Sequence, residues 1–256
     1  MNSEKAKISK DLKQIKLSAM VICQNEEAKI SRCLESLAFC DEIVVIDGGS
    51  IDKTIEIASS FTENVFTRKY TGTNNQKEFG RTKCYGKWIL NLDADEYIPE
   101  DLAKEISLLT QSQKNHFQGY RLPIKTHLGG YFLRHNGYYP GYQKRLFQKD
   151  LGHWSFESEP HDRVILKGKW GKAKYHIMHE TGNCLKDLED KAIANGKIAS
   201  LKLMEQHYQP DMLSKHFRPS WRFIRSYIFK HGFLDRKYGF ELAKLSYLEG
   251  KIKYSK

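Results

Sequence analysis

The sequence predicts an α/β fold in which a mostly parallel, Rossmann-like sheet is flanked by helices and followed by a helical, basic C-terminal extension. Two observations predict it. Apolar runs of strand length alternate with segments of helical period over residues 17–109, and residues 185–256 are helical in pattern. We expect a polar leader at residues 1–16, the α/β domain at 17–184 and the extension at 185–256. A chain of 256 residues is long enough to bury one large core.

The first unit of the predicted sheet is a strand followed by a helix. The apolar run of residues 17–23 indicates a buried strand. Apolar residues then recur at helical spacing and form one stripe that could pack on the sheet: Ile30, Cys33, Leu34 and Leu37. Asn25 lies between the two segments and is a residue type that favours helix N-caps.

The same pattern continues along the chain. Further strands are predicted at residues 42–47, 64–66 and 87–92, and further helices at 52–61, 75–85 and 99–109. Strand-like runs at 120–128, 142–148 and 163–166 then indicate mixed or antiparallel strands with long loops. Because ligands bind beyond the carboxyl ends of parallel strands, we expect Asn25, Asp47 and Asp93 to lie at one edge of the sheet.

The extension carries most of the positive charge. Residues 211–256 hold eleven Lys or Arg against four Asp or Glu, which is +7 of the net +11. Helix breaks are expected near Pro210, Pro219 and Gly232. From Arg218 to Lys230, aromatic and aliphatic residues alternate with basic ones, a pattern that suits a helix lying on an anionic membrane surface. Docking of this helix on the α/β domain is the other interpretation.

Composition limits the class and the compartment of the protein. With 40% hydrophobic and 29% charged residues, the chain is too apolar to be disordered. Its apolar runs fall far short of the ~20 residues that cross a bilayer, and its polar N-terminus lacks the pattern of a signal peptide. Five cysteines without a Cys-x-x-Cys pair indicate reduced, mostly buried thiols. We therefore expect a cytoplasmic protein, peripheral on the inner face of the cell membrane if the basic extension binds lipid.

An acidic cluster follows the predicted strand at residues 87–92. Asp93 and Asp95, with Glu96 beside them, are oxygen donors of the kind that bind Mg²⁺ or Mn²⁺ together with a diphosphate. Such a metal would neutralise the charge that builds on a leaving diphosphate. The alternative interpretation is an acidic N-terminus of the helix that begins at Pro99. Position directly after an apolar strand favours the metal site.

Three sequence motifs carry a family resemblance. The segments Val21–Glu27, Ile43–Thr54 and Trp88–Glu96 resemble, in order and spacing, the nucleotide-sugar motifs of inverting family 2 glycosyltransferases. Within that family, residues 17–250 are most similar to the small bacterial lipopolysaccharide-core glucosyltransferases. The resemblance implies a GT-A fold, a divalent metal, a nucleotide-diphosphate sugar donor and inversion. It further implies transfer of a single hexose, glucose from UDP-glucose, to a saccharide or glycolipid acceptor such as a lipopolysaccharide core.

The resemblance also implies roles for individual residues. Asn25, Glu26 and Asp47 would line the nucleoside pocket. Asp93 would face the ribose and the metal, and Asp95 would ligate the metal. The chain departs from many relatives at one position: Gly48 stands where they carry a second acid that often contacts uracil, so the UDP assignment has less support than the family itself.

Residues further along the chain match the acceptor side of the family. An inverting transfer needs a base for the acceptor hydroxyl, and Asp162 matches the acid at that place in close relatives, with Glu159 and Glu157 as alternatives. His179 resembles a family histidine near diphosphate and metal, and a hydrogen-bonded structural role is its alternative. Arg145 matches a recurrent Arg-Leu-Phe and could neutralise phosphate, whereas an exposed, solvated role is its alternative.

Two other functions remain open from the residues alone. A sugar nucleotidyltransferase could use a similar sheet, but no Gly-rich phosphate loop followed by Lys lies near the N-terminus. A non-enzymatic nucleic-acid-binding module could use the basic helices. This second function leaves the acidic cluster unexplained, so we expect no nucleic acid as a partner.

Overall fold

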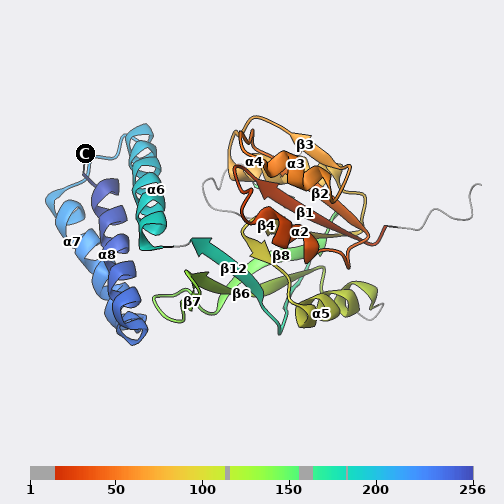
Figure 1. Ribbon diagram of the computed structural model, residues 1–256. Helices are drawn as coiled ribbons and strands as arrows, with labels where there is room; N and C mark the ends of the chain where they lie inside the picture. The colour runs from red at the N-terminus through yellow and green to blue at the C-terminus, as the bar shows by residue number, and fades with distance from the viewer. Residues whose placement is uncertain (1–14, 113–115, 156–163, 183, 256) are drawn as a thin grey trace, which may run out of the picture. The chain divides into compact units, whose positions relative to one another are not determined.

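Figure 1 shows the computed structural model, which describes residues 15–112, 116–155, 164–182 and 184–255. The chain forms two compact units, each assembled from separate stretches of the sequence. The first unit comprises Met1–Leu122 and Gln143–Tyr175, and the second comprises Pro123–Tyr142 and His176–Lys256. Two strands, β6 (Gly119–Leu128) and β8 (Gly141–Gln148), run from one unit into the other.

The first unit is built on a sheet with strands in the order β3-β2-β1-β4-β8. The first four are parallel to their neighbours and β8 is antiparallel to β4. Their bounds are β1 (Leu17–Cys23), β2 (Glu42–Asp47), β3 (Val65–Thr67) and β4 (Trp88–Asp93). The short strands of the unit are β5 (Glu96–Tyr97), β9 (Gly152–Trp154), β10 (Val164–Leu166) and β11 (Trp170–Lys172). Strands β1, β2 and β4 are buried almost throughout, as expected for continuous apolar runs in a parallel sheet.

The helices in the described part of the first unit are α2 (Ile30–Glu35), α3 (Thr54–Ser59), α4 (Thr73–Lys83) and α5 (Glu100–Gln111). The predicted α/β alternation is therefore observed. The predicted cap at Asn25 is wrong, because α2 begins at Ile30 after Lys29 as its N-cap. Asn25 instead adopts a left-handed conformation with φ of 56°, which small polar residues tolerate, and its side chain binds a neighbouring loop.

Helix α4 packs closely on strands β1 and β2. A Cβ atom at Gly80 would lie 2.5 Å from Met20 Sδ and 2.9 Å from Ile46 Cγ1, so a larger residue here would force Met20 and Ile46 to move. Met20 and Ile46 belong to a buried core that also contains Ile89 and Phe147. Side chains alternate along a strand, and Asp93 lies four residues after Ile89 on β4. Asp93 therefore faces the same side of the sheet as α4.

The second unit combines strands with long helices. Within it, β12 (Ile177–Gly182) is parallel to β6, and β7 (Tyr131–Phe132) is antiparallel to it. The helices are α6 (Leu185–Glu205), α7 (Met212–Ile224) and α8 (Arg236–Lys253), with a π-helical turn η2 (Arg225–Phe229) and a 3-10 turn η3 (Gly232–Asp235). Its own core contains Leu128, Leu133, Leu188 and Leu242.

The helix breaks agree with the sequence at two of three positions. Helix α6 ends at Glu205 and α7 begins at Met212, which confirms the break near Pro210, and η3 begins at Gly232. The break expected near Pro219 is wrong, because Pro219 lies inside α7. A proline fixes a helical φ and removes a single N–H donor, so a helix that packs along its length can continue through it.

Candidate active site

The register of the sheet brings the predicted strand-end residues to one edge. Cys23 pairs with Asp47 on one side of β1, and Ile22 pairs with Asp93 on the other. The two aspartates therefore flank the end of β1, and Asn25 follows two residues beyond that end. This is the carboxyl edge of the parallel strands, where ligands bind in sheets of this type.

Two loops beyond this edge are joined by a series of hydrogen bonds. The backbone N–H of Asn25 donates to Ser50 Oγ (2.8 Å), and Asn25 Oδ1 accepts from the backbone N–H of Ile51 (2.9 Å). The backbone N–H of Glu26 donates to Thr54 Oγ1 (2.8 Å). Glu27 adds a further pair, with its N–H donating to Asp52 Oδ2 and its Oε2 accepting from Lys53 N–H. The loops after β1 and β2 thus hold each other in place.

Asp47 is fully buried and organises its own loop. Its carboxylate accepts hydrogen bonds from the backbone N–H groups of Gly49 (2.8 Å) and Ser50 and from the Ser50 hydroxyl. Gly49 has a φ of 97°, a conformation that favours glycine. A Cβ at Gly48 would lie 3.3 Å from Gln24 Cβ and Cδ, so this glycine lets Gln24 lie against the loop. The predicted contact of Asp47 with a nucleoside stays a prediction.

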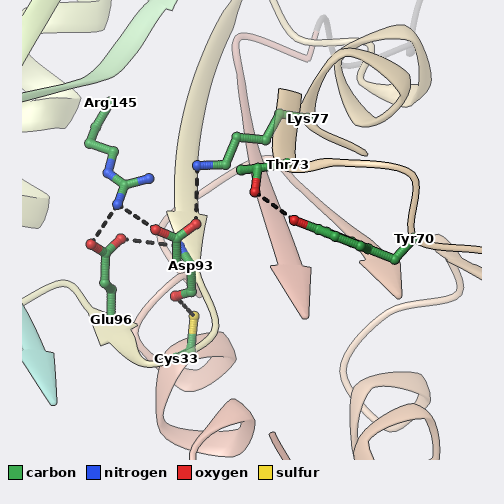
Figure 2. Close-up of polar contacts among 7 residues, drawn as sticks. All are labelled: Cys33, Tyr70, Thr73, Lys77, Asp93, Glu96 and Arg145. Atoms are coloured by element: carbon green, nitrogen blue, oxygen red, sulfur yellow. Dashed lines mark hydrogen bonds and ion pairs between the residues drawn. The ribbon is translucent and has the colours of Figure 1, made fainter. Parts of the chain in front are cut away.

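Asp93 lies between two buried cations (Figure 2). Its Oδ1 is 3.1 Å from Lys77 Nζ, and its Oδ2 is 2.6 Å from Arg145 Nη2. The same Arg145 nitrogen is 2.6 Å from Glu96 Oε1, while Glu96 Oε2 accepts the backbone N–H of Asp93 at 3.0 Å. Two cations and two carboxylates therefore form one network at the end of β4.

The two cations of the network are buried in the protein, whereas Asp93 is partly exposed. The side chains of Lys77 and Arg145 are 2% and 6% exposed, whereas that of Asp93 is 36% exposed. Desolvation by itself would raise the pKa of Asp93, but the Arg145 guanidinium, and after it the Lys77 ammonium, outweigh it and hold that pKa well below its usual range. Asp93 is therefore ionised throughout the neutral pH range. Its negatively charged carboxylate is partly exposed at the sheet edge.

Lys77 is the residue that sequence reasoning missed. It lies on the buried face of α4 with Asn74 and Gly80, at helical spacing. The sequence contains one signal for it. Helical spacing places this lysine on the buried face of the helix, and a buried Lys requires a partner. Its partner Asp93 lies sixteen residues later along the chain. Figure 2 also shows Thr73, the first residue of the same helix, and Tyr70 in the segment before it, whose hydroxyl oxygens lie 2.9 Å apart.

Asp95 lies in the turn between β4 and β5 and is partly exposed. It is two residues from Asp93, and Ala94 between them is buried. Glu96 follows immediately, and its side chain is 2% exposed and bound to Arg145. Glu96 therefore helps to hold Arg145 in place at the site. The alternative interpretation of this cluster, an acidic N-terminus for the next helix, does not account for Glu96, whose carboxylate turns toward Arg145. Glu100 and Asp101 occupy the first turn of α5 instead.

The other predicted site residues have different standing. Asp162, with the alternatives Glu157 and Glu159, lies outside the described residues. His179 lies on β12 in the second unit, where its Nδ1 is 3.4 Å from Thr126 Oγ1. Its role beside metal or phosphate stays a prediction. Arg145 is buried rather than exposed, so its surface alternative is wrong.

Comparison with known proteins decides the family. The model of the family "Glycosyl transferase family 2" matches residues 18–162, more than half of the chain. The chain belongs to glycosyl transferase family 2. This confirms the resemblance carried by the three motifs, and membership in the family supports a transferase activity.

Curated relatives of this family 2 chain cover most of its length. It is 28% identical over 232 residues to the lipopolysaccharide core biosynthesis glycosyltransferase LpsC of Rhizobium meliloti, covering 86% of this chain and 83% of that protein. It is also 28% identical over 242 residues to an uncharacterized glycosyltransferase of Rickettsia bellii, covering 88% and 79% of the two chains.

A solved structure supports the fold. The crystal structure of S. aureus TarS, residues 1–349, matches with a TM-score of 0.51 at 15% identity, covering 94% of this chain and 89% of that one. The predicted GT-A fold, a mixed sheet with flanking helices followed by C-terminal helices, is confirmed for this family 2 member. Among its described residues, no helix is both long and apolar enough to cross a membrane.

Proposed function

We propose that the protein transfers a single hexose, glucose from UDP-glucose, with inversion and divalent-metal assistance, onto a saccharide or glycolipid acceptor of the lipopolysaccharide-core type. One observation carries the proposal. Asp93 is ionised and is fixed between Lys77 and Arg145. The partly exposed Asp95 follows two residues later, at the same edge of the sheet as the hydrogen-bonded loops after β1 and β2. Family membership favours this function over a sugar nucleotidyltransferase or a nucleic-acid-binding module.

The nucleotide would lie along the carboxyl edge of the sheet. Asn25, Glu26 and the loop organised by Asp47 are candidates to contact the nucleoside, because hydrogen bonds between the loops fix them before a ligand arrives. Such preorganisation lowers the entropic cost of binding. Asp93 presents its partly exposed side to a ribose hydroxyl, an acceptor role that an ionised carboxylate fills well.

The donor set suits a Mg²⁺ or Mn²⁺ ion that is shared with the substrate. The described residues contain no group of three or more His, Cys, Asp or Glu that could hold a metal by themselves. Mg²⁺ sites commonly use one or two carboxylates and complete the shell with phosphate oxygens and water. Asp95 is the candidate ligand in the first unit, with Asp93 as a further candidate, although Asp93 is already bound to two cations. When bound, the ion would neutralise the leaving diphosphate.

A general base completes the proposed mechanism. Attack by the acceptor hydroxyl on the anomeric carbon, opposite the departing diphosphate, inverts that carbon and requires removal of the hydroxyl proton. Asp162 is our candidate for this base. Arg145, which touches Asp93 and Glu96, acts in this proposal by holding Asp93 in place and by adding positive charge near the diphosphate. The acceptor class is supported by the similarity to LpsC.

The donor and the metal can be tested by ligand-dependent thermal unfolding. Because a ligand that binds the folded state alone stabilises it, UDP-glucose at 100-fold its Kd should add about 2.7 kcal/mol. We expect UDP-glucose with Mn²⁺ to raise the Tm more than UDP-glucose with EDTA, and more than other nucleotide sugars. The matched control is Asp95→Asn, which should abolish the difference between Mn²⁺ and EDTA. Equal shifts in both conditions with the wild-type protein would rule out metal-assisted donor binding.

A further inference from the structure

Apolar side chains are exposed along one face of α7 and the turns that follow it. They recur at spacings of four, four, three and four residues and so form a single stripe on a helical surface. Their residues and exposed fractions are Leu213 64%, Phe217 56%, Trp221 43%, Ile224 38% and Ile228 54%. Large apolar side chains in a continuous stripe of this kind mark an interaction surface, because monomeric proteins rarely expose them together.

Aromatic rings extend this stripe into the turns. The rings of Phe217 and Trp221 are stacked with centroids 6.3 Å apart, and Trp221 contacts Phe229 at 5.5 Å. Phe229 is 63% exposed, and Phe233 and Leu234 in η3 are 46% and 53% exposed. The exposed face therefore runs from α7 through η2 to η3, and we call it the α7 face.

The α7 face carries a net positive charge. Residues 211–234 contain five Lys or Arg and one acid, Asp211, whose Oδ1 accepts from the Ser214 N–H at the start of α7. Lys215, Arg225 and Lys230 are exposed. Arg218 is exposed as well, and its Nη1 donates to the Tyr254 hydroxyl at 3.2 Å. Arg222 is half-buried against α8, where its Nε donates to the Ser246 carbonyl at 2.9 Å and its Nη2 pairs with Glu249 Oε1 at 2.8 Å.

The opposite side of α7 is already used within the second unit. Pro219 is buried, and a Cβ at Gly250 of α8 would lie 3.2 Å from Pro219 Cα, so the two helices are in close contact. The next acid along the chain, Asp235, is 2% exposed and bound to His135 Nδ1 at 2.8 Å. Glu249 of α8 offsets the charge of Arg222, and Asp211 lies at the start of α7, so the α7 face keeps an excess of positive charge.

We propose that the α7 face docks on an anionic lipid bilayer. The apolar stripe would enter the boundary between headgroups and acyl chains, while Arg225 and Lys230 bind the phosphates at its margin. Lys215 is four residues before Pro219 and therefore lies on the side of α7 that faces α8. Charge excludes a symmetric second copy as the preferred occupant, since an isologous contact would bring like charges together. A nucleic acid would stack on aromatic rings but would leave the aliphatic residues Leu213, Ile224 and Ile228 without a role.

Binding to vesicles tests the proposal with the whole chain. Co-sedimentation is measured with vesicles of phosphatidylcholine plus phosphatidylglycerol, and with pure phosphatidylcholine for comparison. We expect the double variant Arg225→Glu/Lys230→Glu to bind the anionic vesicles at least ~25-fold more weakly, since each basic residue contributes roughly fivefold. The double variant Phe217→Ser/Trp221→Ser should lose binding at least ~10-fold through its apolar contribution. Circular dichroism and Tm confirm that these exposed substitutions leave the fold intact.

Matched controls lie in the first unit. Leu108→Ser removes an apolar residue of α5 that is 71% exposed, and Lys167→Glu/Lys169→Glu reverses two exposed lysines. Both should bind vesicles as the wild type does. The proposal is overturned if the α7 variants also bind as the wild type does, or if anionic lipid gives no gain over phosphatidylcholine. It is equally overturned by a dimer in light scattering that Phe217→Ser/Trp221→Ser dissociates. Because no nucleotide sugar is present, the outcome does not depend on the proposed donor or metal.

Discussion

At the scale of single residues, Asp93 neutralises two cations that the fold has buried. Lys77 and Arg145 are 2% and 6% exposed, and each lies within 3.1 Å of an Asp93 oxygen. From the sequence alone, Asp93→Asn is expected to remove metal-dependent donor binding with little change in stability. The ion pairs revise that expectation, because the substitution leaves buried positive charge with less compensation.

We predict that Asp93→Asn lowers the free energy of unfolding by about 3 kcal/mol, the low end of the range for breaking a buried ion pair, because Asp93 is 36% exposed. Urea unfolding at neutral pH measures this loss. Asp95→Asn is the control, and its unfolding free energy should stay within about 0.5 kcal/mol of wild type, the usual effect of a surface substitution. Equal stability of Asp93→Asn and wild type would show that the network contributes no net stability.

The pH dependence of stability follows from the same pair. The pKa of Asp93 is lowered in the folded state, so its contribution is fully present above the unfolded pKa of about 3.9 and is lost as the pH falls below it. We therefore predict that the difference in unfolding free energy between wild type and Asp93→Asn shrinks between pH 5 and ~2. Urea unfolding of both proteins across this range measures it. A difference that stays constant down to the lowest pH would contradict the lowered pKa.

A separate prediction concerns the chemical step. Asp162→Asn should lower kcat by about 10²–10⁴-fold with donor affinity unchanged, because a general base acts on the acceptor hydroxyl and other residues hold the nucleotide. Asp162→Glu should keep partial activity, since it retains the carboxylate and changes only its reach. Steady-state kinetics and donor titration separate the two effects. If Asp162→Asn turned over normally while Glu159→Gln were inactive, the general base would be Glu159, three residues earlier in the chain.

The site was partly predictable from the sequence for a physical reason. Asp93 and Asp95 follow directly after an apolar run, so one local pattern gives both the strand and the carboxylates at its end. Lys77 and Arg145 reach Asp93 from α4 and β8, and no local pattern states which carboxylate neutralises a buried lysine. Which residues of separate elements pair with each other depends on the tertiary fold, which local sequence patterns do not specify.

At the scale of elements, the strands were more predictable than the turns. Continuous apolar runs gave β1, β2 and β4 to within a residue or two. Asn25 was misassigned because the same small polar residue favours both a helix cap and a left-handed turn, and the choice depends on the Ile51 N–H that it binds. Pro219 was misassigned because close contact with α8 supports α7 through the proline.

Helix contacts in the second unit depend on a glycine in α6. A Cβ at Gly196 would lie 2.9 Å from Ile252 Cβ and 3.1 Å from the carbonyl oxygen of Glu249, so α6 and α8 touch at this point. We predict that Gly196→Leu lowers the unfolding free energy by about 1–3 kcal/mol, the usual cost of overpacking, despite the higher helix propensity of leucine. Chemical denaturation tests it against Lys197→Leu, the exposed neighbour, which should be neutral or stabilising. A stabilised Gly196→Leu would show that the helices separate without cost.

At the scale of the whole molecule, the burial of the cysteine thiols shows how the chain is packed. Most of the thiols are buried or half-buried, as predicted: Cys23, Cys33 and Cys84 are buried, Cys40 is half-buried and Cys184 is exposed. Their reduced state stays a prediction. Burial, with some help from nearby carboxylates, raises the pKa of Cys23 to about 12, and burial likewise raises that of Cys84 to about 12.

We predict that a thiol reagent at pH 8 modifies Cys184 rapidly in the folded protein and leaves Cys23, Cys33 and Cys84 unmodified until unfolding. Counting released chromophore with and without denaturant measures this. Cys184→Ser should remove the rapid phase. Rapid modification of more than two thiols in the native protein would contradict the packing described for β1, α2 and the end of α4.

The interleaving of the two units has a consequence for biosynthesis. Residues 123–142 belong with residues 176–256, and His135 binds Asp235 one hundred positions later. On a ribosome, residues 123–142 emerge long before the helices they pack against, so their apolar side chains, including Leu128 and Leu133, remain uncovered for that interval. The first unit can gather all of its residues once Tyr175 has emerged. Translation speed between codons 142 and 235, and access of a chaperone to the waiting segment, should therefore influence how much nascent chain reaches the native state.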